Sequence, residues 1–310
     1  MNGSERTMAC VSRSSRVHDD APACAAPSAV PVPALQGQSG WHADLQLGFE
    51  RRGARSVLAY RRHEGPYLVQ KALYPEGLEC CHAILLHPPG GIASGDVLRL
   101  DATVGPRAHA LLTTPGAAKW YRSTGAQAVC ETRLAVEPDG SLEWLPRESI
   151  VFDRSRARAR MHLEVAARAR CLGWELWCLG RTASGERFRS GRLAIEMRLT
   201  VAGRLRWEER GILDADAALL QSAAGFASQP VFGTLWAVGP EAPAALLSAC
   251  REIQPTGSGR GALTQLPDVL IARYLGASTE EAFTWLSMIW SVLRPAYVGR
   301  AAARPRIWAA

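Results

Sequence analysis

Residues 85–123, LLHPPGGIASGDVLRLDATVGPRAHALLTTPGAAKWYRS, contain the pattern that decides the fold. Within this stretch the apolar residues Leu98, Leu100, Ala102 and Val104 alternate with polar ones, and a loop rich in glycine and proline lies on either side. Alternation with a period of two indicates a strand that buries one face. The two loops are typical of tight turns between strands.

Neither loop carries the residues of a phosphate-binding or hydrolytic site. A P-loop needs a lysine and a hydroxyl directly after its last glycine, but Asp96 follows Gly95, and Lys119 is followed by Trp120. The chain also has no G-x-S-x-G nucleophile elbow and no plausible ordered triad. We therefore expect no catalytic residues, and an unrecognised hydrolase stays only as a remote alternative.

The same alternation extends from Leu45 to Trp207, for example over 45–49, 161–165 and 193–201. Turn signals separate the runs: Arg52-Gly53, Pro138-Asp139-Gly140, Ser184-Gly185 and Ala202-Gly203. The spacing predicts a mainly β fold of stacked antiparallel sheets.

Helices are expected only late in the chain, as a small C-terminal portion. The pattern predicts short helices over 214–224 and 241–253. A longer one begins at the capping box of Ser278 and Glu281 and is expected to stop at Pro295.

Composition limits the class of protein. Of the 310 residues, 47% are hydrophobic, and no uninterrupted apolar run reaches the roughly 18 residues that a membrane span needs. The eight cysteines show no framework spacing, which favours reduced thiols and a cytoplasmic location. Residues 1–40 lack the apolar core of a signal peptide, so we expect a disordered N-terminal arm there and one β-rich domain over 41–310.

The formal net charge is +7, and arginine supplies nearly all of the positive charge. The densest cluster is Arg154, Arg156, Arg158 and Arg160, which a strand would place on one face. Such a ladder fits a solvated outer face or an acidic protein partner, and no nucleic-acid fold signature accompanies it. A basic, β-rich module that binds nucleic acid or protein is the competing interpretation.

The stretch 85–123 and five further separated blocks resemble the UreD/UreH family of urease accessory proteins, in the order expected for that family. The resemblance covers about residues 45–310 and rests on the HPPGGI, LTTPGA and YRS wording within 85–123, ESIVFD at 148–153, WELWCLGRTASGE at 174–186, the short blocks at 233–235 and 273–276, and the ending LRPAYVGRAAARPRIWAA. It implies sheets stacked in an elongated, loosely helical arrangement over 41–310.

The resemblance also implies a function. Members of this family are non-catalytic factors of urease maturation that bind UreF, UreG and urease apoprotein and that help nickel to reach the urease. We therefore expect these protein partners, no nucleic acid and no membrane. We also expect transient nickel(II) rather than a tightly bound cofactor.

Several side chains could line a nickel path. Four carboxylates, Asp153, Glu186, Glu148 and Glu175, stand among large apolar residues, where each needs an arginine, a backbone donor or a cation. Arg181 is the obvious intramolecular partner, and a structural ion pair is the alternative.

Cys80, Cys81, His82 and His87 are also of suitable type for a borderline metal ion, and the resemblance points to Cys81 and His82. However, adjacent residues of a strand point to opposite faces, so a buried cysteine and a hydrogen-bonded histidine are the alternative.

The C-terminal helix and tail are the predicted UreF-facing surface, because aromatic and arginine residues make effective interface anchors. The candidates are Trp285, Trp290, Arg294, Arg300, Arg304, Ile307 and Trp308. The alternative is that helix and tail pack within the chain.

Overall fold

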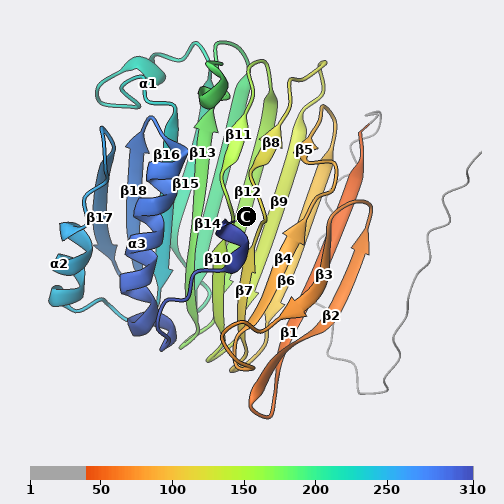
Figure 1. Cartoon of the computed structure of the whole chain (residues 1–310), viewed down its shortest axis with the longest axis vertical. Helices are drawn as coiled ribbons and strands as arrows, with labels where there is room; N and C mark the ends of the chain where they lie inside the picture. Colours follow the sequence, from red (N-terminus) through yellow and green to blue (C-terminus); the bar gives the residue numbers. More distant parts are fainter. Residues whose placement is uncertain (1–39, 310) are drawn as a thin grey trace, which may run out of the picture. The chain divides into compact units, whose positions relative to one another are not determined.

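Two stacked β-sheets make up most of the computed structural model, which describes residues 40–309. The first sheet has seven strands, in the spatial order β15 (Arg204–Asp214), β14 (Arg192–Val201), β12 (Arg156–Val165), β9 (Ala128–Val136), β6 (Val97–Val104), β1 (His42–Arg52) and β2 (Arg55–Glu64). The second sheet has eleven strands and lies alongside the first (Figure 1).

Eight strands of the second sheet follow one another in the order β17 (Arg260–Leu266), β18 (Val269–Gly276), β16 (Val231–Val238), β13 (Arg170–Leu179), β10 (Ser141–Leu145), β7 (His109–Thr113), β4 (Cys81–Leu86) and β3 (Leu68–Leu73). Three short strands, β5 (Gly91–Ile92), β8 (Ala118–Trp120) and β11 (Ser149–Val151), pair beside this path. The predicted mainly β fold of stacked sheets with a small C-terminal helix is confirmed.

The prediction of antiparallel pairing is wrong for the central strands. The chain passes from one sheet to the other, from β6 to β7, from β9 to β10 and from β12 to β13, so that neighbours in a sheet come from successive turns of a coil. The pairs β1/β6, β6/β9, β9/β12 and β12/β14 of the first sheet, and β4/β7, β7/β10 and β10/β13 of the second, are therefore parallel.

Of the four predicted turns, two are hairpins, and the other two, at 138–140 and 184–185, lie between strands of different sheets. Arg52-Gly53 joins the antiparallel pair β1/β2, and Ala202-Gly203 joins β14/β15. Pro138-Asp139-Gly140 instead joins β9 to β10, which belong to different sheets. The residues of a tight turn reverse the chain locally, but they do not determine which sheet receives the next strand.

Three α-helices lie in the C-terminal part: α1 (Ala218–Gln221), α2 (Ala244–Glu252) and α3 (Thr279–Val298). Two short 3₁₀ helices, η1 (Thr182–Ser184) and η2 (Arg306–Ala309), complete the set in the described residues. The helix predicted over 214–224 is reduced to the four residues of α1.

The longest helix begins as predicted but ends later. The Ser278 hydroxyl accepts the backbone N–H of Glu281 at 3.2 Å. Pro295 does not stop α3, which continues to Val298 and ends at Gly299 in the left-handed conformation. A proline keeps a helical φ and removes one hydrogen bond, and the last turn is held by the buried Tyr297.

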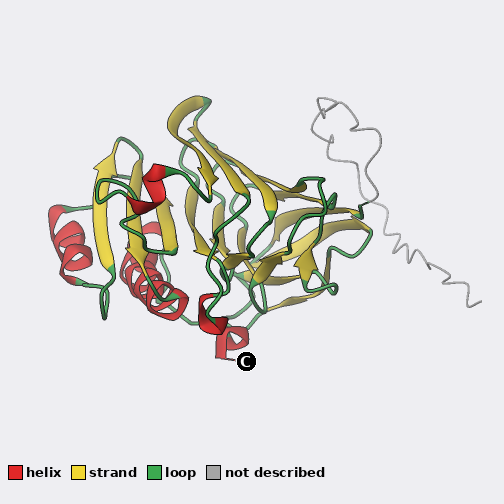
Figure 2. Ribbon diagram, turned by 90° about the horizontal axis from the view of Figure 1, so that it is seen from above, coloured by secondary structure: helices red, strands yellow, loops and turns green. Residues whose placement is uncertain are grey.

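The apolar core has two layers. One fills the space between the sheets, and the other lies between the second sheet and α3, which contacts β13, β16 and β18 (Figure 2). Strand β13 is buried on both faces, because its alternate residues enter the two layers in turn: Cys171, Trp177 and Leu179 face the first sheet, whereas Leu172, Trp174 and Leu176 face α3.

Residues 38–310 form one compact unit. The disordered arm predicted over 1–40 lies, apart from Gly40, outside the described residues. The six cysteines within the described residues are free thiols. Among those residues, no helix combines the length and the apolar character that crossing a membrane requires.

Candidate functional site

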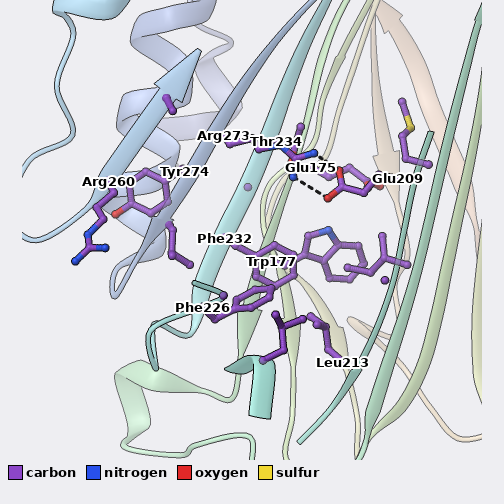
Figure 3. Close-up of a pocket in the computed structure, with 18 of the residues that line it drawn as sticks. Glu175, Trp177, Glu209, Leu213, Phe226, Phe232, Thr234, Arg260, Arg273 and Tyr274 are labelled. Carbon is purple, nitrogen blue, oxygen red and sulfur yellow. Dashed lines mark hydrogen bonds and ion pairs between the residues drawn. The ribbon is translucent and has the colours of Figure 1, made fainter. Parts of the chain in front are cut away.

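A cavity of about 580 Å³ lies between the two sheets, where β13, β16 and β18 face β14 and β15 (Figure 3). Its walls are mainly aromatic and aliphatic, with Trp177, Trp207, Phe226, Phe232 and Leu213 among the lining residues. A second cavity of about 100 Å³ lies further along the same space and is lined by residues of β8, β9, β10, β12 and β13.

Glu175 lies where the two cavities meet, because Glu175 and Trp177 line both of them. Cys171 and Trp177, on the same face of β13, belong to the core between the sheets, so the carboxylate of Glu175 points into that core. No basic side chain of the described residues pairs with it. Glu175 is therefore a carboxylate without a cationic partner at the junction of two cavities.

The environment of Glu175 favours its neutral form. Burial, together with the smaller effect of the negative charge of Glu209, raises the pKa of this carboxyl to about 7, and the indole N–H of Trp177 opposes the shift. Glu209 itself pairs with Arg273 at 2.8 Å, at the partly exposed mouth of the larger cavity (Figure 3). The Glu175 carboxyl therefore holds its proton to a higher pH than an exposed glutamate does.

The smaller cavity contains further polar groups on the opposite wall. Cys130 and Thr132 of β9 line it together with Glu175. Burial raises the pKa of the Cys130 thiol to about 12, and the charge of Glu175 contributes to this shift, as expected for two groups that share one cavity.

The other three predicted carboxylates line neither cavity. Asp153 accepts the backbone N–H groups of Arg189 and Ser190, each at 2.8 Å, and Glu186 pairs with Arg181 at 2.7 Å. Glu148 lies 3.3 Å from the guanidinium of Arg147. Each of these three side chains therefore has a hydrogen-bond or ion-pair partner within the chain, as the structural alternative to a metal path requires. Their role in nickel passage stays a prediction.

Cys81 and His82 point to opposite faces of β4, as the strand geometry predicts. Cys81 lies in the core between the sheets, whereas His82 turns towards the other side and contacts Glu76 through Nε2 at 2.7 Å. The two residues cannot bind the same ion. The ring of His87 packs against Tyr67 and does not join His82 or Cys81.

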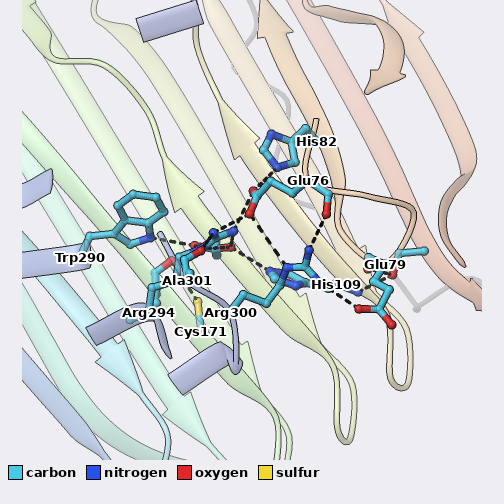
Figure 4. Close-up of polar contacts among 12 residues, drawn as sticks. Glu76, Glu79, His82, His109, Cys171, Trp290, Arg294, Arg300 and Ala301 are labelled. Atoms are coloured by element: carbon cyan, nitrogen blue, oxygen red, sulfur yellow. Dashed lines mark hydrogen bonds and ion pairs between the residues drawn. The ribbon is translucent and has the colours of Figure 1, made fainter. Parts of the chain in front are cut away.

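His82 belongs instead to a buried polar cluster on the α3 side of the second sheet, formed by Glu76, Cys80, His82, His109, Glu143 and Arg294 (Figure 4). Arg294 donates to Glu143 through Nε and Nη2, at 3.0 and 2.9 Å, and to Glu76 through Nη1 at 2.6 Å. Burial opposes ionisation of both carboxyls, but the hydrogen bonds and charges of His82 and Arg294 at Glu76, and of His109 and Arg294 at Glu143, hold their pKa values at about 2.

Sequence reasoning missed most of this cluster. Glu76, His109 and Glu143 are far apart in the chain and show no motif spacing. The one available signal is Glu143, a lone carboxylate in the apolar strand SLEWL, where burial demands a partner.

The structure corrects the predicted exposure of three partner-binding residues. Trp285, Trp290 and Arg294 are at most 2% exposed, and their polar groups bond within the chain: the indole of Trp285 donates to Ile253 O and that of Trp290 to Glu143, each within 2.8 Å. These residues cannot be exposed anchors, because α3 lies with this face against the second sheet.

The tail after α3 is held against the same layer. Trp308 packs against Trp174, Phe283 and Trp290, and its indole N–H donates to Thr113 at 2.9 Å. Arg300 pairs with Glu79 at 2.9 Å. Ile307 is half-buried and Arg304 is exposed.

One arginine of the predicted basic ladder, Arg160, lies between acidic residues of the neighbouring strands. One row of residues in register across the first sheet alternates in charge, and we call it the charge row: Asp44, Arg99, Glu131, Arg160, Glu196 and Arg210. Its neighbours lie 3.2 to 3.8 Å apart. Arg154 is not part of the strand, because it lies in the preceding turn with a φ of 65°. The face is not uniformly basic, which disfavours nucleic acid.

Comparisons with known proteins show the family of this chain. The sequence model of the UreD urease accessory protein family matches residues 42–309. The chain belongs to the UreD family. The urease accessory protein UreD of Dechloromonas aromatica (strain RCB) is 50% identical over 284 residues, which cover 91% of this chain and 99% of that protein. UreD of Azoarcus sp. (strain BH72) is 50% identical over 271 residues, 87% of this chain and 95% of that protein. UreD of Nitrosococcus oceani is 47% identical over 285 residues, 92% of this chain and 96% of that protein.

Three of the blocks that resemble the UreD family, at 85–123, 148–153 and 174–186, contribute to the smaller cavity. Strands β5 and β8 come from the first block and β11 from the second; they pair in parallel with one another, and β11 pairs with β13. They contribute Ile92, Ala118, Trp120 and Ser149 to the wall opposite Cys130. These segments of UreD-like sequence therefore line the same cavity as Glu175.

Proposed function

We propose that this chain is a non-catalytic factor of urease maturation that docks UreF and UreG onto urease apoprotein and conducts nickel through the two cavities between its sheets. The observation that carries the proposal is the position of Glu175, an unpaired carboxylate at the junction of these cavities in a chain of the UreD family.

The chemistry of the junction suits transient passage. Carboxylate oxygen is a weak ligand for a borderline divalent ion, which keeps several of its waters when only one protein group binds it. Because the pKa of Glu175 is about 7, a proton competes with the metal ion for this carboxylate at neutral pH. A site of this kind holds nickel briefly and releases it, whereas a closed set of four ligands would retain it.

For UreF we propose the outer side of α3 and the tail. Met288 is 47% exposed on α3, and Arg304 is exposed in the tail, with Ile307 half-buried beside it. Arg300 and Trp308 hold the tail in place and so support this surface from within. An exposed methionine and arginine beside an apolar side chain form a suitable centre for a protein interface.

Co-expression tests the role of the chain. Urease subunits are produced with UreF and UreG, with and without this chain, and the purified urease is analysed for nickel and for activity. We expect nickel and activity only when the chain is present. Equal nickel content in both samples would refute the maturation role.

A second arm tests the passage. Glu175→Leu removes the carboxylate from the junction, and Glu164→Gln changes an exposed carboxylate on the outer face of β12 as the matched control. We expect Glu175→Leu to lower the nickel content of urease at least severalfold while UreF still copurifies, and Glu164→Gln to leave both unchanged. Normal nickel loading by a folded Glu175→Leu protein would exclude the junction as part of the path.

A further inference from the structure

The buried cluster on the α3 side of the second sheet contains two overlapping sets of metal-ligating atoms. Within the first set, ligand atoms of Cys80, His109 and Glu143 all lie within 4.8 Å of one another, and within the second set the same holds for Glu76, Cys80 and His82. Cys80 belongs to both sets. Three neighbouring strands supply the donors, since His82 is on β4, His109 on β7 and Glu143 on β10 (Figure 4).

These donors are of the types that borderline divalent ions select. Thiolate, imidazole and carboxylate together bind zinc, cobalt or nickel in proteins, whereas magnesium and calcium require oxygen alone. Cys80 and Glu143 are fully buried, and His82 and His109 are at most 8% exposed. An ion held here would be shielded from water.

The net charge of the cluster is negative and can be neutralised by one further cation. With neutral imidazoles, the carboxylates of Glu76 and Glu143 and the guanidinium of Arg294 sum to a net charge of −1 in a buried space. Arg300 lies 4.0 Å from Glu76 and 2.9 Å from Glu79, and counting Arg300 together with Glu79 leaves the sum unchanged, because their charges are opposite. A divalent cation that displaces the thiol proton of Cys80 adds one positive charge and brings the group to neutrality.

We propose that this cluster is a binding site for one borderline divalent metal ion, ligated by Cys80, His109 and Glu143, with Glu76 and His82 as the further donors. The Cys80 thiol releases its proton to solvent and binds as thiolate. When the ion binds, the ring proton that His109 Nε2 donates to Glu143, 2.8 Å away, is replaced by a proton on Nδ1, so the imidazole stays neutral and Nε2 is free to ligate the ion.

Arg294 and Trp290 remain outside the coordination sphere. Arg294 and the indole of Trp290 already donate to Glu143, at 2.9 Å and 2.7 Å, as the outer hydrogen-bond donors of a ligating carboxylate usually do. The site is separate from the cavities between the sheets, because it lies on the other face of the second sheet, and it does not depend on the proposed nickel passage.

Access to the cluster runs under the tail rather than through the core. Arg294 also donates to the carbonyl of Ala301, and Arg300 donates to the backbone oxygen of Glu76 at 2.6 Å. The outer partner of Arg300, Glu79, has a side chain that is 60% exposed. Displacement of the tail at Arg300 and Ala301 would therefore give the cluster a route to solvent.

Cobalt(II) binding to the purified full chain tests the site in the absence of UreF, UreG and urease. We expect one cobalt ion per chain with the near-ultraviolet band of a thiolate–cobalt bond. Cys80→Ser abolishes that band, whereas Cys81→Ser retains it, because the neighbouring thiol points into the core between the sheets. His109→Gln keeps the thiol and lowers the cobalt affinity by roughly tenfold or more.

Two results would overturn the proposal. One is the absence of the thiolate–cobalt band from the folded wild-type chain at millimolar cobalt. The other is a band that persists in Cys80→Ser. If Cys80→Ser does not fold, the cobalt affinities of His109→Gln and the wild type are compared instead. Equal affinities would contradict the proposed site. Because no urease is present, the outcome is independent of whether the chain supports urease maturation.

Discussion

Arg294 and Glu143 are 151 positions apart in the chain and form a fully buried ion pair, with Nε and Nη2 of the guanidinium at 3.0 and 2.9 Å from the carboxylate oxygens. The pair joins α3 to the central strand β10, and Trp290, one helical turn earlier, donates to the same carboxylate. The C-terminal helix is therefore attached to the second sheet by charge as well as by apolar contact.

Arg294→Met should destabilise the chain by about 3–5 kcal/mol, because it leaves the carboxylates of Glu143 and Glu76 buried without their cation. The free energy of unfolding in urea measures the effect. Arg210→Met is the control, since Arg210 is at the exposed edge of the charge row, and the loss there should stay below about 1 kcal/mol. Equal losses of unfolding free energy for the two variants would contradict the assignment of Arg294 to a stabilising buried ion pair.

Glu175→Gln should make the chain more stable at high pH. The pKa of Glu175 is about 7 in the folded protein and about 4.5 when unfolded, so the folded state binds more protons between these values and the wild-type stability falls as the pH rises through 7. The variant lacks this titration. Its advantage should grow from near zero at pH 4 to at most about 3 kcal/mol at pH 8.

Urea unfolding of both proteins at pH 5, 6, 7 and 8 measures this difference. Glu164→Gln is again the control, because its carboxylate is exposed on the outer face and its difference from the wild type should not vary with pH in this range. A constant difference between Glu175→Gln and the wild type would show that Glu175 is not held in a desolvated position.

The charge row should contribute cross-strand coupling that depends on salt. In a double-mutant cycle on Arg160 and Glu131, 3.2 Å apart on neighbouring parallel strands, we expect a coupling energy of about 0.5–1 kcal/mol. The coupling should decrease in 1 M NaCl, because the pair is partly exposed. Arg160→Glu should cost more than Arg160→Met, since it places three carboxylates side by side with Glu131 and Glu196.

Trp308→Ala should release the tail without unfolding the sheets. The substitution removes aromatic contacts to Trp174, Phe283 and Trp290 and the hydrogen bond to Thr113, and we expect a loss of about 2 kcal/mol. Trypsin should then cleave after Arg306 much faster than in the wild type. Met288→Ala, at an exposed position of α3, is the control for an unaltered tail.

Much of the local structure could be predicted from the chain itself. Alternating residues such as Leu98, Leu100 and Ala102 identified strands correctly, because a half-buried strand needs an apolar side chain at every second position. The Ser278 cap was found for a similar reason, since its partner Glu281 is only three residues away. Glu175 was recognised as a carboxylate among large apolar residues, although its position between two cavities was not.

The rest depends on which strands become neighbours, and that is a property of the whole chain. Residues 138–140 have turn chemistry, but the second sheet receives β10 only because the coil places β7 and β13 on either side of it. The aromatic and arginine residues of α3 were compatible both with an exposed interface and with packing inside the chain. They are buried because β13, β16 and β18 present an apolar face to this helix.

The amino-acid sequence by itself determined the strands, the C-terminal helix and the family, because each depends on residues close together or on wording that can be compared directly. Only the tertiary structure decided that the central strands are parallel and that Glu175 stands alone between two cavities. It also decided that Cys80, His109, Glu143 and Arg294 meet in one buried cluster. Contacts across many tens of residues leave no local pattern, since the free energy that forms them comes from burial shared by the entire fold.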